Sequence, residues 1–196
     1  MTHAEADRQT LMRDLTVPPR TVAVTGAGGS LGRALLCALH RQGDRLIALT
    51  SGTAPIDVRD DQGQPIPLRQ VAWQCGREAD LQPVLAEVDI LVLNHGVNVH
   101  ADRSLEAVQR SLEVNALSHW RLLELFATLS AGDADGSRAG AGRRELWVNT
   151  SEAEIQPAVS PLYEISKRLQ GQLLSLRSLD LAGPQLRIRQ IGRAHV

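Results

Sequence analysis

Aromatic residues are scarce in this 196-residue sequence, where phenylalanine, tryptophan and tyrosine together make up 3%. So few rings argue against a surface that stacks single-stranded nucleic acid. The formal net charge of −1 removes the general electrostatic case for nucleic acid or an anionic membrane as a partner. No apolar run is long enough to span a bilayer, and no signal peptide precedes the first predicted strand. We therefore expect a cytoplasmic protein that binds neither nucleic acid nor membrane.

Cysteine is also rare, because Cys37 and Cys75 are the only two and cannot form a disulfide framework. Cys37 falls on the apolar face of a predicted helix and is interpreted as a small core residue. Such low cysteine usage is typical of a protein in a reducing compartment. We also predict that the chain has no metal site. The length suits one domain, and a hydrophobic content of 43% suits a soluble globular one.

A glycine-rich turn organises the rest of the chain. The apolar run Val22 to Val24 predicts a buried strand, and leucines 31, 35, 36 and 39 recur at helical spacing after the turn. A strand, a glycine turn and a helix bring a dinucleotide pyrophosphate to the helix N-terminus. Gly26 permits the tight turn, Gly29 the approach of phosphate, and Gly32 the close packing of helix on strand. The predicted cofactor-binding residues here are Gly26, Gly28, Gly29, Ser30, Leu31, Gly32 and Arg33. Taken alone, the motif is also compatible with an ordinary strand-to-helix turn.

Strand and helix patterns alternate after this turn. Strands are predicted at 46–49, 71–75, 88–93, 145–149 and 186–191, helices at 31–42, 81–86, 104–126 and 161–181, and loops at 53–67 and 130–143. The helix that Ser104 caps has Leu105, Val108, Leu112, Ala116, Leu122, Leu123 and Phe126 on its apolar side. The alternation implies right-handed crossovers and a doubly wound parallel sheet, an α/β Rossmann fold with three αβα layers. Ligands then bind beyond the carboxyl ends of the strands.

The predicted nucleotide-binding domain covers residues 21–191. Residues 1–20 are polar and are expected to form a leader. Residues 192–196 can be encoded by a common sequencing adapter, and we expect them to be an artefactual tail. We therefore expect the natural protein to continue past the strand at 186–191, so that the domain is truncated at its C-terminus.

Several motifs occur in order at the predicted strand ends: Thr25-Gly26-x-x-Gly29-x-x-Gly32, Asn94-x-Gly96, Asn115, Ser151 and Tyr163-x-x-x-Lys167. Together they resemble the short-chain dehydrogenase/reductase family. More loosely, residues 93–98 and 147–154 resemble its members described as bifunctional sterol desaturase/short-chain dehydrogenases, although the membrane spans and histidine clusters of a desaturase are absent.

The resemblance implies an NAD(P)(H)-dependent oxidoreductase that transfers hydride between nicotinamide and the carbonyl or alcohol of a small-molecule substrate. It implies that Ser151 binds the substrate oxygen, that Asn115 holds a water linked to Lys167, and that Lys167 also binds the nicotinamide ribose. Asn94 and Gly96 join the cofactor site, together with Tyr163 and Lys167. The full-length protein is a candidate homo-oligomer.

The residues themselves support an acid/base pair. Tyr163 and Lys167 lie four positions apart and so share one helix face. A phenol titrates near pH ~10 and is a poor acid or base at neutrality. A nearby ammonium favours the phenolate, which lets the phenol exchange a proton with a carbonyl or alcohol oxygen. Tyr163 is the only tyrosine of the sequence, so its position four residues before Lys167 argues against a chance placement.

Some positions depart from the family pattern. The glycine spacing resembles the extended branch, which includes epimerases and dehydratases, whereas Asn115 resembles the single-domain branch. His95 replaces a usual alanine and either faces the nicotinamide or is a hydrogen-bonded structural residue. Ser151 lies one residue short of the common spacing to the tyrosine, so Thr150 is an alternative hydroxyl. Cys75-Gly76 stands where an adenine-binding aspartate is usual.

Cofactor preference depends on the end of the second predicted strand, where an NAD enzyme usually has an acid. Thr50 and Ser51 offer hydroxyls and no charge there, and Arg33 lies just past the glycine turn, so we favour NADP over NAD. Two alternatives to the oxidoreductase stay open. One is a nucleotide-binding sensor or interaction protein without turnover, and the other is an extended-branch epimerase or dehydratase.

Overall fold

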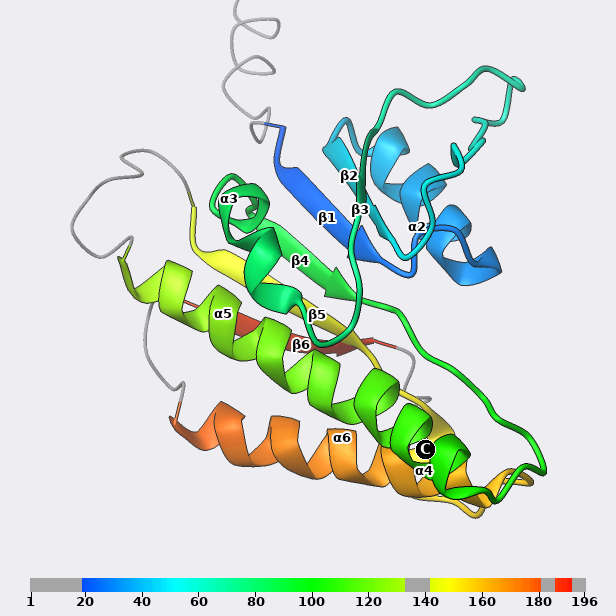
Figure 1. Ribbon diagram of the computed structural model, residues 1–196. Coiled ribbons are helices and arrows are strands. Elements are labelled where there is room, and N and C mark those ends of the chain that lie inside the picture. Colours follow the sequence, from blue (N-terminus) through cyan, green and yellow to red (C-terminus); the bar gives the residue numbers. More distant parts are fainter. Residues whose placement is uncertain (1–18, 133–141, 181–185, 192–196) are drawn as a thin grey trace, which may run out of the picture.

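The computed structural model describes residues 19–132, 142–180 and 186–191 of the chain (Figure 1). The predicted leader, except its last two residues, the predicted tail and most of the loop at 130–143 lie outside this described part. Six parallel strands form one sheet in the order β3-β2-β1-β4-β5-β6. Their bounds are β1 Thr21–Thr25, β2 Arg45–Thr50, β3 Arg69–Ala72, β4 Ile90–Leu93, β5 Arg144–Asn149 and β6 Leu186–Ile191. The doubly wound α/β fold predicted from the sequence is confirmed.

Helices cover both faces of this sheet, so two separate cores form. On one face, α2 (Ser30–Arg41) buries Leu36 and Leu39 against Val22 and Val24 of β1. On the other face, α3 (Gln82–Leu85), α5 (Ser118–Gly132) and α6 (Pro161–Asp180) pack over the sheet, where Phe126 is fully buried. Figure 1 shows α5 and α6 side by side on that face. All four residues of β4 are buried, as a central parallel strand requires.

The helix predicted at 104–126 is not one continuous α-helix. It consists of α4 (Leu105–Leu112), the π-helical segment η2 (Glu113–Leu117) and then α5. Ser104 caps α4 as predicted, because its Oγ accepts the Ala107 N–H at 3.1 Å. Leu105 is 72% exposed, so its assignment to the apolar side is wrong. It is the first residue of α4, whose later turns pack against α6.

Smaller differences concern boundaries. The third strand lies at Arg69–Ala72 rather than 71–75, because the chain leaves the sheet through a turn at Gly76, whose φ is +90°. The helix predicted at 81–86 is preceded by a 3-10 turn, η1 (Glu78–Leu81). A second 3-10 turn, η4 (Glu152–Glu154), follows β5. Cys37 is half-buried against the α2 core, which partly confirms its interpretation as a core residue.

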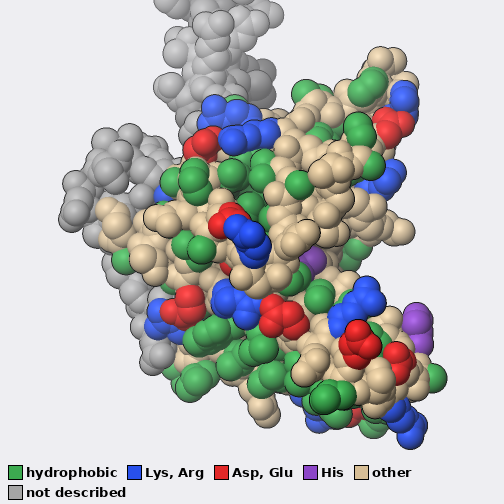
Figure 2. Space-filling model, viewed as in Figure 1, with side chains coloured by type: hydrophobic (Ala, Val, Ile, Leu, Met, Phe, Trp, Pro, Cys, Tyr) green, Lys and Arg blue, Asp and Glu red, His purple; other side chains and the backbone are tan. Residues whose placement is uncertain are grey.

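Acidic and basic side chains alternate over the face in Figure 2, without a large area of one sign. Among the described residues, no helix is long and apolar enough to cross a membrane. In the same part of the chain, no cluster of histidine, cysteine and carboxylate side chains has the arrangement of a metal site.

Candidate active site

The turn between β1 and α2 requires glycine at two positions. Gly26 has a φ of +62°, and a Cβ there would lie 2.8 Å from the Cα of His95. A Cβ on Gly32 would lie 2.3 Å from the Gly26 carbonyl oxygen and 2.8 Å from the Cα of Ala27. Glycine therefore lets the turn close against the loop after β4 and lets α2 begin directly against the turn.

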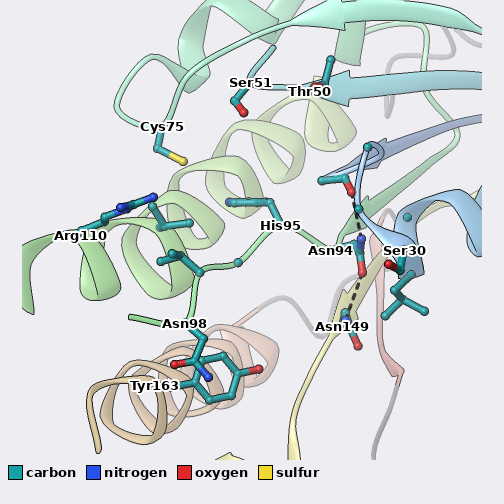
Figure 3. A pocket seen from close by; sticks show the side chains of 18 of the residues that line it. Ser30, Thr50, Ser51, Cys75, Asn94, His95, Asn98, Arg110, Asn149 and Tyr163 are labelled. Carbon is teal, nitrogen blue, oxygen red and sulfur yellow. Dashed lines mark hydrogen bonds between the residues drawn. The ribbon is translucent and has the colours of Figure 1, made fainter. Parts of the chain in front are cut away.

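A cleft of about 900 Å³ opens beyond the carboxyl ends of the strands, beginning at this turn (Figure 3). Its lining includes most of the predicted site: Gly26, Gly28, Gly29, Ser30, Leu31, Gly32, Thr50, Ser51, Asn94, Gly96, Tyr163 and Lys167. Leu31 is half-exposed there, which corrects its placement on the buried face of α2. Figure 3 shows Thr50 and Ser51 on the side of the cleft opposite Tyr163.

Three predicted site residues are not part of the lining: Arg33, Asn115 and Ser151. Arg33 is exposed and donates through Nε to the Gly28 carbonyl and through Nη1 to the Asp57 carbonyl, both at 3.1 Å. It thus joins the glycine turn to the loop that follows β2. Its guanidinium lies at the rim of the turn rather than inside the cleft.

Asn115 fixes the wall of the cleft from behind. It is fully buried, its Oδ1 accepts the Val97 N–H at 2.7 Å, and its Nδ2 donates to the Val97 carbonyl at 2.8 Å. The second Nδ2 hydrogen goes to Ser166 Oγ at 2.9 Å. Asn115 lies in the π-helical segment. This conformation is rare in proteins, and where it occurs it is often at a functional site. Its predicted role in holding a water stays a prediction.

Side-chain hydrogen bonds join the carboxyl ends of β1, β4 and β5 at the edge of the cleft. The Thr25 hydroxyl donates to the Val92 carbonyl at 3.1 Å and accepts the Asn94 N–H at 2.8 Å. Asn149 at the end of β5 donates to Asn94 Oδ1 at 3.1 Å (Figure 3). These bonds hold two polar side chains in fixed positions beside the glycine turn.

The predicted tyrosine–lysine pair lies in this cleft. Lys167 is 5% exposed, and its Nζ donates to Gln170 Oε1 at 2.8 Å and to the Asn149 carbonyl at 3.4 Å. The same Nζ lies 5.9 Å from the centroid of the Tyr163 ring. Burial lowers the pKa of the Lys167 ammonium from 10.5 to about 8, while the charge of Glu154 acts in the opposite direction.

His95 lines the cleft but is committed to structural hydrogen bonds. His95 Nδ1 lies 2.9 Å from the Thr25 hydroxyl oxygen, and its Nε2 lies 3.1 Å from the Ser118 hydroxyl oxygen. Burial lowers the pKa of His95 to about 3, with the charge of Lys167 adding to the effect. Of the two readings of this residue, the structure favours the neutral, hydrogen-bonded one.

The hydroxyls after β5 differ in their partners. Thr150 is buried and donates to the Ile191 carbonyl at 3.0 Å, which binds it to β6. Ser151 is half-buried and accepts the Ala153 N–H at 3.2 Å, so it begins the turn η4. Of the two acids in this turn, Glu152 is exposed whereas Glu154 is buried against α6.

Other lining residues were not predicted as site residues. They are Trp73, Cys75, His95, Val97, Asn98, Arg110, Val114 and Asn149. Asn149 could have been identified because it ends a predicted strand, whereas Arg110 and Val114 lie in the predicted helix at 104–126 and belong to no motif themselves. No carboxylate occurs among the described residues that line the cleft, while Arg110 and Lys167 contribute two cations. This charge balance suits an anionic ligand.

More than half of the chain matches a known protein family. Residues 22–156 match the model of the NAD dependent epimerase/dehydratase family. These residues include the glycine turn, β4 and β5. The chain belongs to this family. Its glycine spacing, which resembles the extended branch with the epimerases, agrees with the match.

Two relatives of the chain carry the names of different activities, one an epimerase and the other a reductase. This chain is 46% identical over 167 residues to "Monoglucosyldiacylglycerol epimerase" of Synechocystis sp.. The match covers 85% of this chain and 39% of that protein. It is 28% identical over 187 residues to "L-xylulose reductase" of Homo sapiens, covering 91% of this chain and 72% of that protein. The chain therefore spans about two fifths of the epimerase's length.

Solved structures confirm the fold of this family member. A short-chain type dehydrogenase/reductase from Mycobacterium marinum matches with a TM-score of 0.72 at 17% identity, covering 91% of this chain and 76% of that one. The short-chain dehydrogenase-like fold implied by the motifs is thus confirmed. The narrower resemblance to sterol desaturase/short-chain dehydrogenases stays a prediction.

Burial of Lys167 predicts a pH-dependent stability. The lysine is protonated in both the folded and the unfolded chain below about pH 8, so its burial opposes folding there. As the pH rises from about 8 to 10.5, the folded chain loses the proton first, and this cost disappears. The difference between the pKa of the lysine in the unfolded chain and in the folded chain corresponds to about 3 kcal/mol of unfolding free energy. We expect Lys167→Met to raise the free energy of unfolding near pH 7, with the difference from the wild type shrinking towards pH ~10.

Urea unfolding of both chains at several pH values measures this difference, and the comparison cancels the titration of other groups. A difference that does not change with pH contradicts the assignment of the effect to the lysine charge.

Proposed function

We propose that this chain binds a nicotinamide dinucleotide in the cleft and acts as an oxidoreductase on a carbonyl or alcohol substrate. One observation carries the proposal: Tyr163 and Lys167 line the same cleft as the glycine turn. The membership of the NAD dependent epimerase/dehydratase family supports the choice of cofactor.

The residues around the turn fit such a cofactor. Gly28 and Gly29 present backbone without side chains, and the N–H groups at the start of α2 attract phosphate. The cleft wall has no carboxylate among its described residues that would repel the diphosphate. Thr50 and Ser51, at the end of β2, lie where the adenosine ribose would bind. A bound nicotinamide would supply or accept the hydride.

The chain's own residues handle the proton. The Tyr163 hydroxyl donates to the carbonyl oxygen in reduction and accepts from the alcohol in oxidation. The Lys167 ammonium, held near the ring, stabilises the negative charge that develops on the phenol oxygen. For the second hydroxyl we favour Ser151 over Thr150, because Thr150 already donates to the Ile191 carbonyl. Ser151 then donates to the substrate oxygen and orients it.

A second candidate is an epimerase, favoured by the 46% identity to the Synechocystis sp. protein. An epimerase returns its substrate in the oxidation state in which it began, so the reaction consumes no cofactor. The same tyrosine and lysine would serve both reactions, because both move a proton at a carbon-bound oxygen.

A pair of assays separates these functions. An oxidoreductase changes the absorbance of NADPH or NADH in the presence of aldehydes, ketones or secondary alcohols. An epimerase leaves that absorbance unchanged and converts the sugar of monoglucosyldiacylglycerol, which NMR detects. Cofactor binding without either reaction supports the remaining alternative, a nucleotide-binding sensor.

We expect NADPH to bind more tightly than NADH, by roughly tenfold, or about 1.4 kcal/mol. No acid follows β2 at Thr50 and Ser51, and the guanidinium of Arg33 lies at the rim of the turn. Arg33→Ala should narrow this preference. Fluorescence titration with both cofactors measures it, and Arg41→Ala on the same helix is the control, because Arg41 pairs with Asp61. Equal affinities in the wild type contradict the NADP preference.

A further inference from the structure

A chain of buried side chains leads from Lys167 away from the cleft. Gln170 lies one turn further along α6, is 1% exposed, and accepts from Lys167 Nζ at 2.8 Å. Its amide group also contacts Nδ1 of His119 on α5, which is 1% exposed. His119 Nε2 in turn lies 2.8 Å from the His95 carbonyl oxygen, behind the wall of the cleft.

The chemistry of these groups allows only one direction of donation. The His95 carbonyl can only accept, so His119 Nε2 carries a proton and donates it. Burial lowers the pKa of His119 well below its usual value, so the ring is neutral and Nδ1 is an acceptor. The Gln170 group that faces Nδ1 is therefore its NH₂, and its oxygen is turned towards Lys167.

We propose that Gln170 and His119 are positioning residues that hold the Lys167 ammonium in the cleft. His119 fixes the orientation of the Gln170 amide, and the amide oxygen then stabilises the charged form of the lysine. The consequence of this arrangement for catalysis rests on the function proposed above. The hydrogen-bond chain from Lys167 to His119 is independent of that function, because it needs no bound substrate.

Other charged and titratable groups surround Lys167 from each neighbouring element. Glu154 of η4 favours the ammonium, while His95 after β4 and His119 on α5 are neutral, and Tyr163 lies on the same helix. The experiment must therefore change Gln170 without changing these groups. Gln172 provides a matched control, because it lies on the same helix but is exposed.

The sequence makes a direct measurement feasible, since Lys167 is its only lysine. In a chain labelled with ¹³C and ¹⁵N in lysine, one side-chain signal reports the pKa of this group. Gln170→Leu removes an acceptor from the ammonium, so we expect the lysine pKa to fall by about one to two pH units. Gln170→Glu supplies a carboxylate and should raise it. Gln172→Leu and Gln172→Glu should leave it unchanged.

His119→Leu tests the second link. Without an acceptor for its NH₂, the Gln170 amide is free to turn, and we expect the lysine pKa to fall in the same direction by a smaller amount. Equal lysine pKa values in the Gln170 and Gln172 variants would overturn the proposal. If Gln170→Leu does not fold, the opposite shift in Gln170→Glu decides the question.

The two proposals fail in different ways. If the lysine pKa shifts as expected but no carbonyl reduction or epimerisation occurs, the positioning chain stands and the proposed reaction is wrong. If the wild type reduces a carbonyl and the pKa does not respond to Gln170, the reaction stands and the positioning role is wrong.

Discussion

Tyr163→Phe is expected to reduce turnover by roughly 10²–10⁴-fold, the usual contribution of a general acid or base. The substitution removes one oxygen and leaves the ring, which lies 5.9 Å from Lys167 Nζ, in place. The dissociation constant of NADPH should change by less than about twofold, since the ring still fills the same part of the cleft. The measurements are steady-state kinetics with the best carbonyl substrate found and a fluorescence titration with NADPH.

Two results would contradict this assignment. Turnover within a few-fold of the wild type would mean that another group moves the proton. Loss of NADPH binding together with turnover would mean that the hydroxyl serves the cofactor rather than the reaction. The variant contains no tyrosine, because Tyr163 is the only one in the sequence. Loss of the phenolate absorbance at high pH therefore verifies the substitution in the protein itself.

Gly32→Ala is expected to destabilise the domain strongly and to abolish cofactor binding. The added Cβ would lie 2.3 Å from the Gly26 carbonyl oxygen and 2.8 Å from the Cα of Ala27, which are backbone atoms. Neither can turn aside as a side chain does, so α2 must move away from the turn. Overpacking of this kind is expected to cost about 3 kcal/mol, or roughly 6–12 °C in the unfolding midpoint.

Gly28→Ala is the matched control in the same turn. Its Cβ would meet only the side-chain Cδ1 of Ile56, at 3.9 Å, and its backbone has no positive φ. We expect its unfolding midpoint to stay close to that of the wild type. Calorimetry of the two variants measures the difference. Equal midpoints for Gly32→Ala and Gly28→Ala would show that the close approach of α2 to the turn is not needed for stability.

Much of the fold could be predicted because its signals are local. The apolar runs at β1 and β4 are bounded by turns, and a parallel order follows from their alternation with helices. The exposure of Leu105 could not be predicted this way. Periodicity shows which residues share a helix face, but the contacts of the helix end depend on the rest of the chain.

The candidate site likewise combines residues that the sequence could predict with residues that it could not. Tyr163 and Lys167 share a helix face by their spacing alone, and the structure places both in the cleft. The contact between Gln170 and His119 joins residues 51 positions apart on two helices. Neither residue belongs to a motif, and their pairing depends on how α5 and α6 pack. Such contacts become visible only when the tertiary structure is known.

The π-helical segment Glu113–Leu117 has a consequence for how this chain can change in length. A π turn holds one more residue than an α turn, so deleting one residue there would leave a regular helix. The helix on either side of the deletion would keep nearly its present orientation, because roughly four residues of α-helix turn as far as about five residues of π-helix. Asn115 lies inside the segment, so its bonds to Val97 would change and the wall of the cleft would lose its support. We therefore expect a chain that lacks one residue here to keep the packing of α4 and α5 but to lose the contact between Asn115 and Val97.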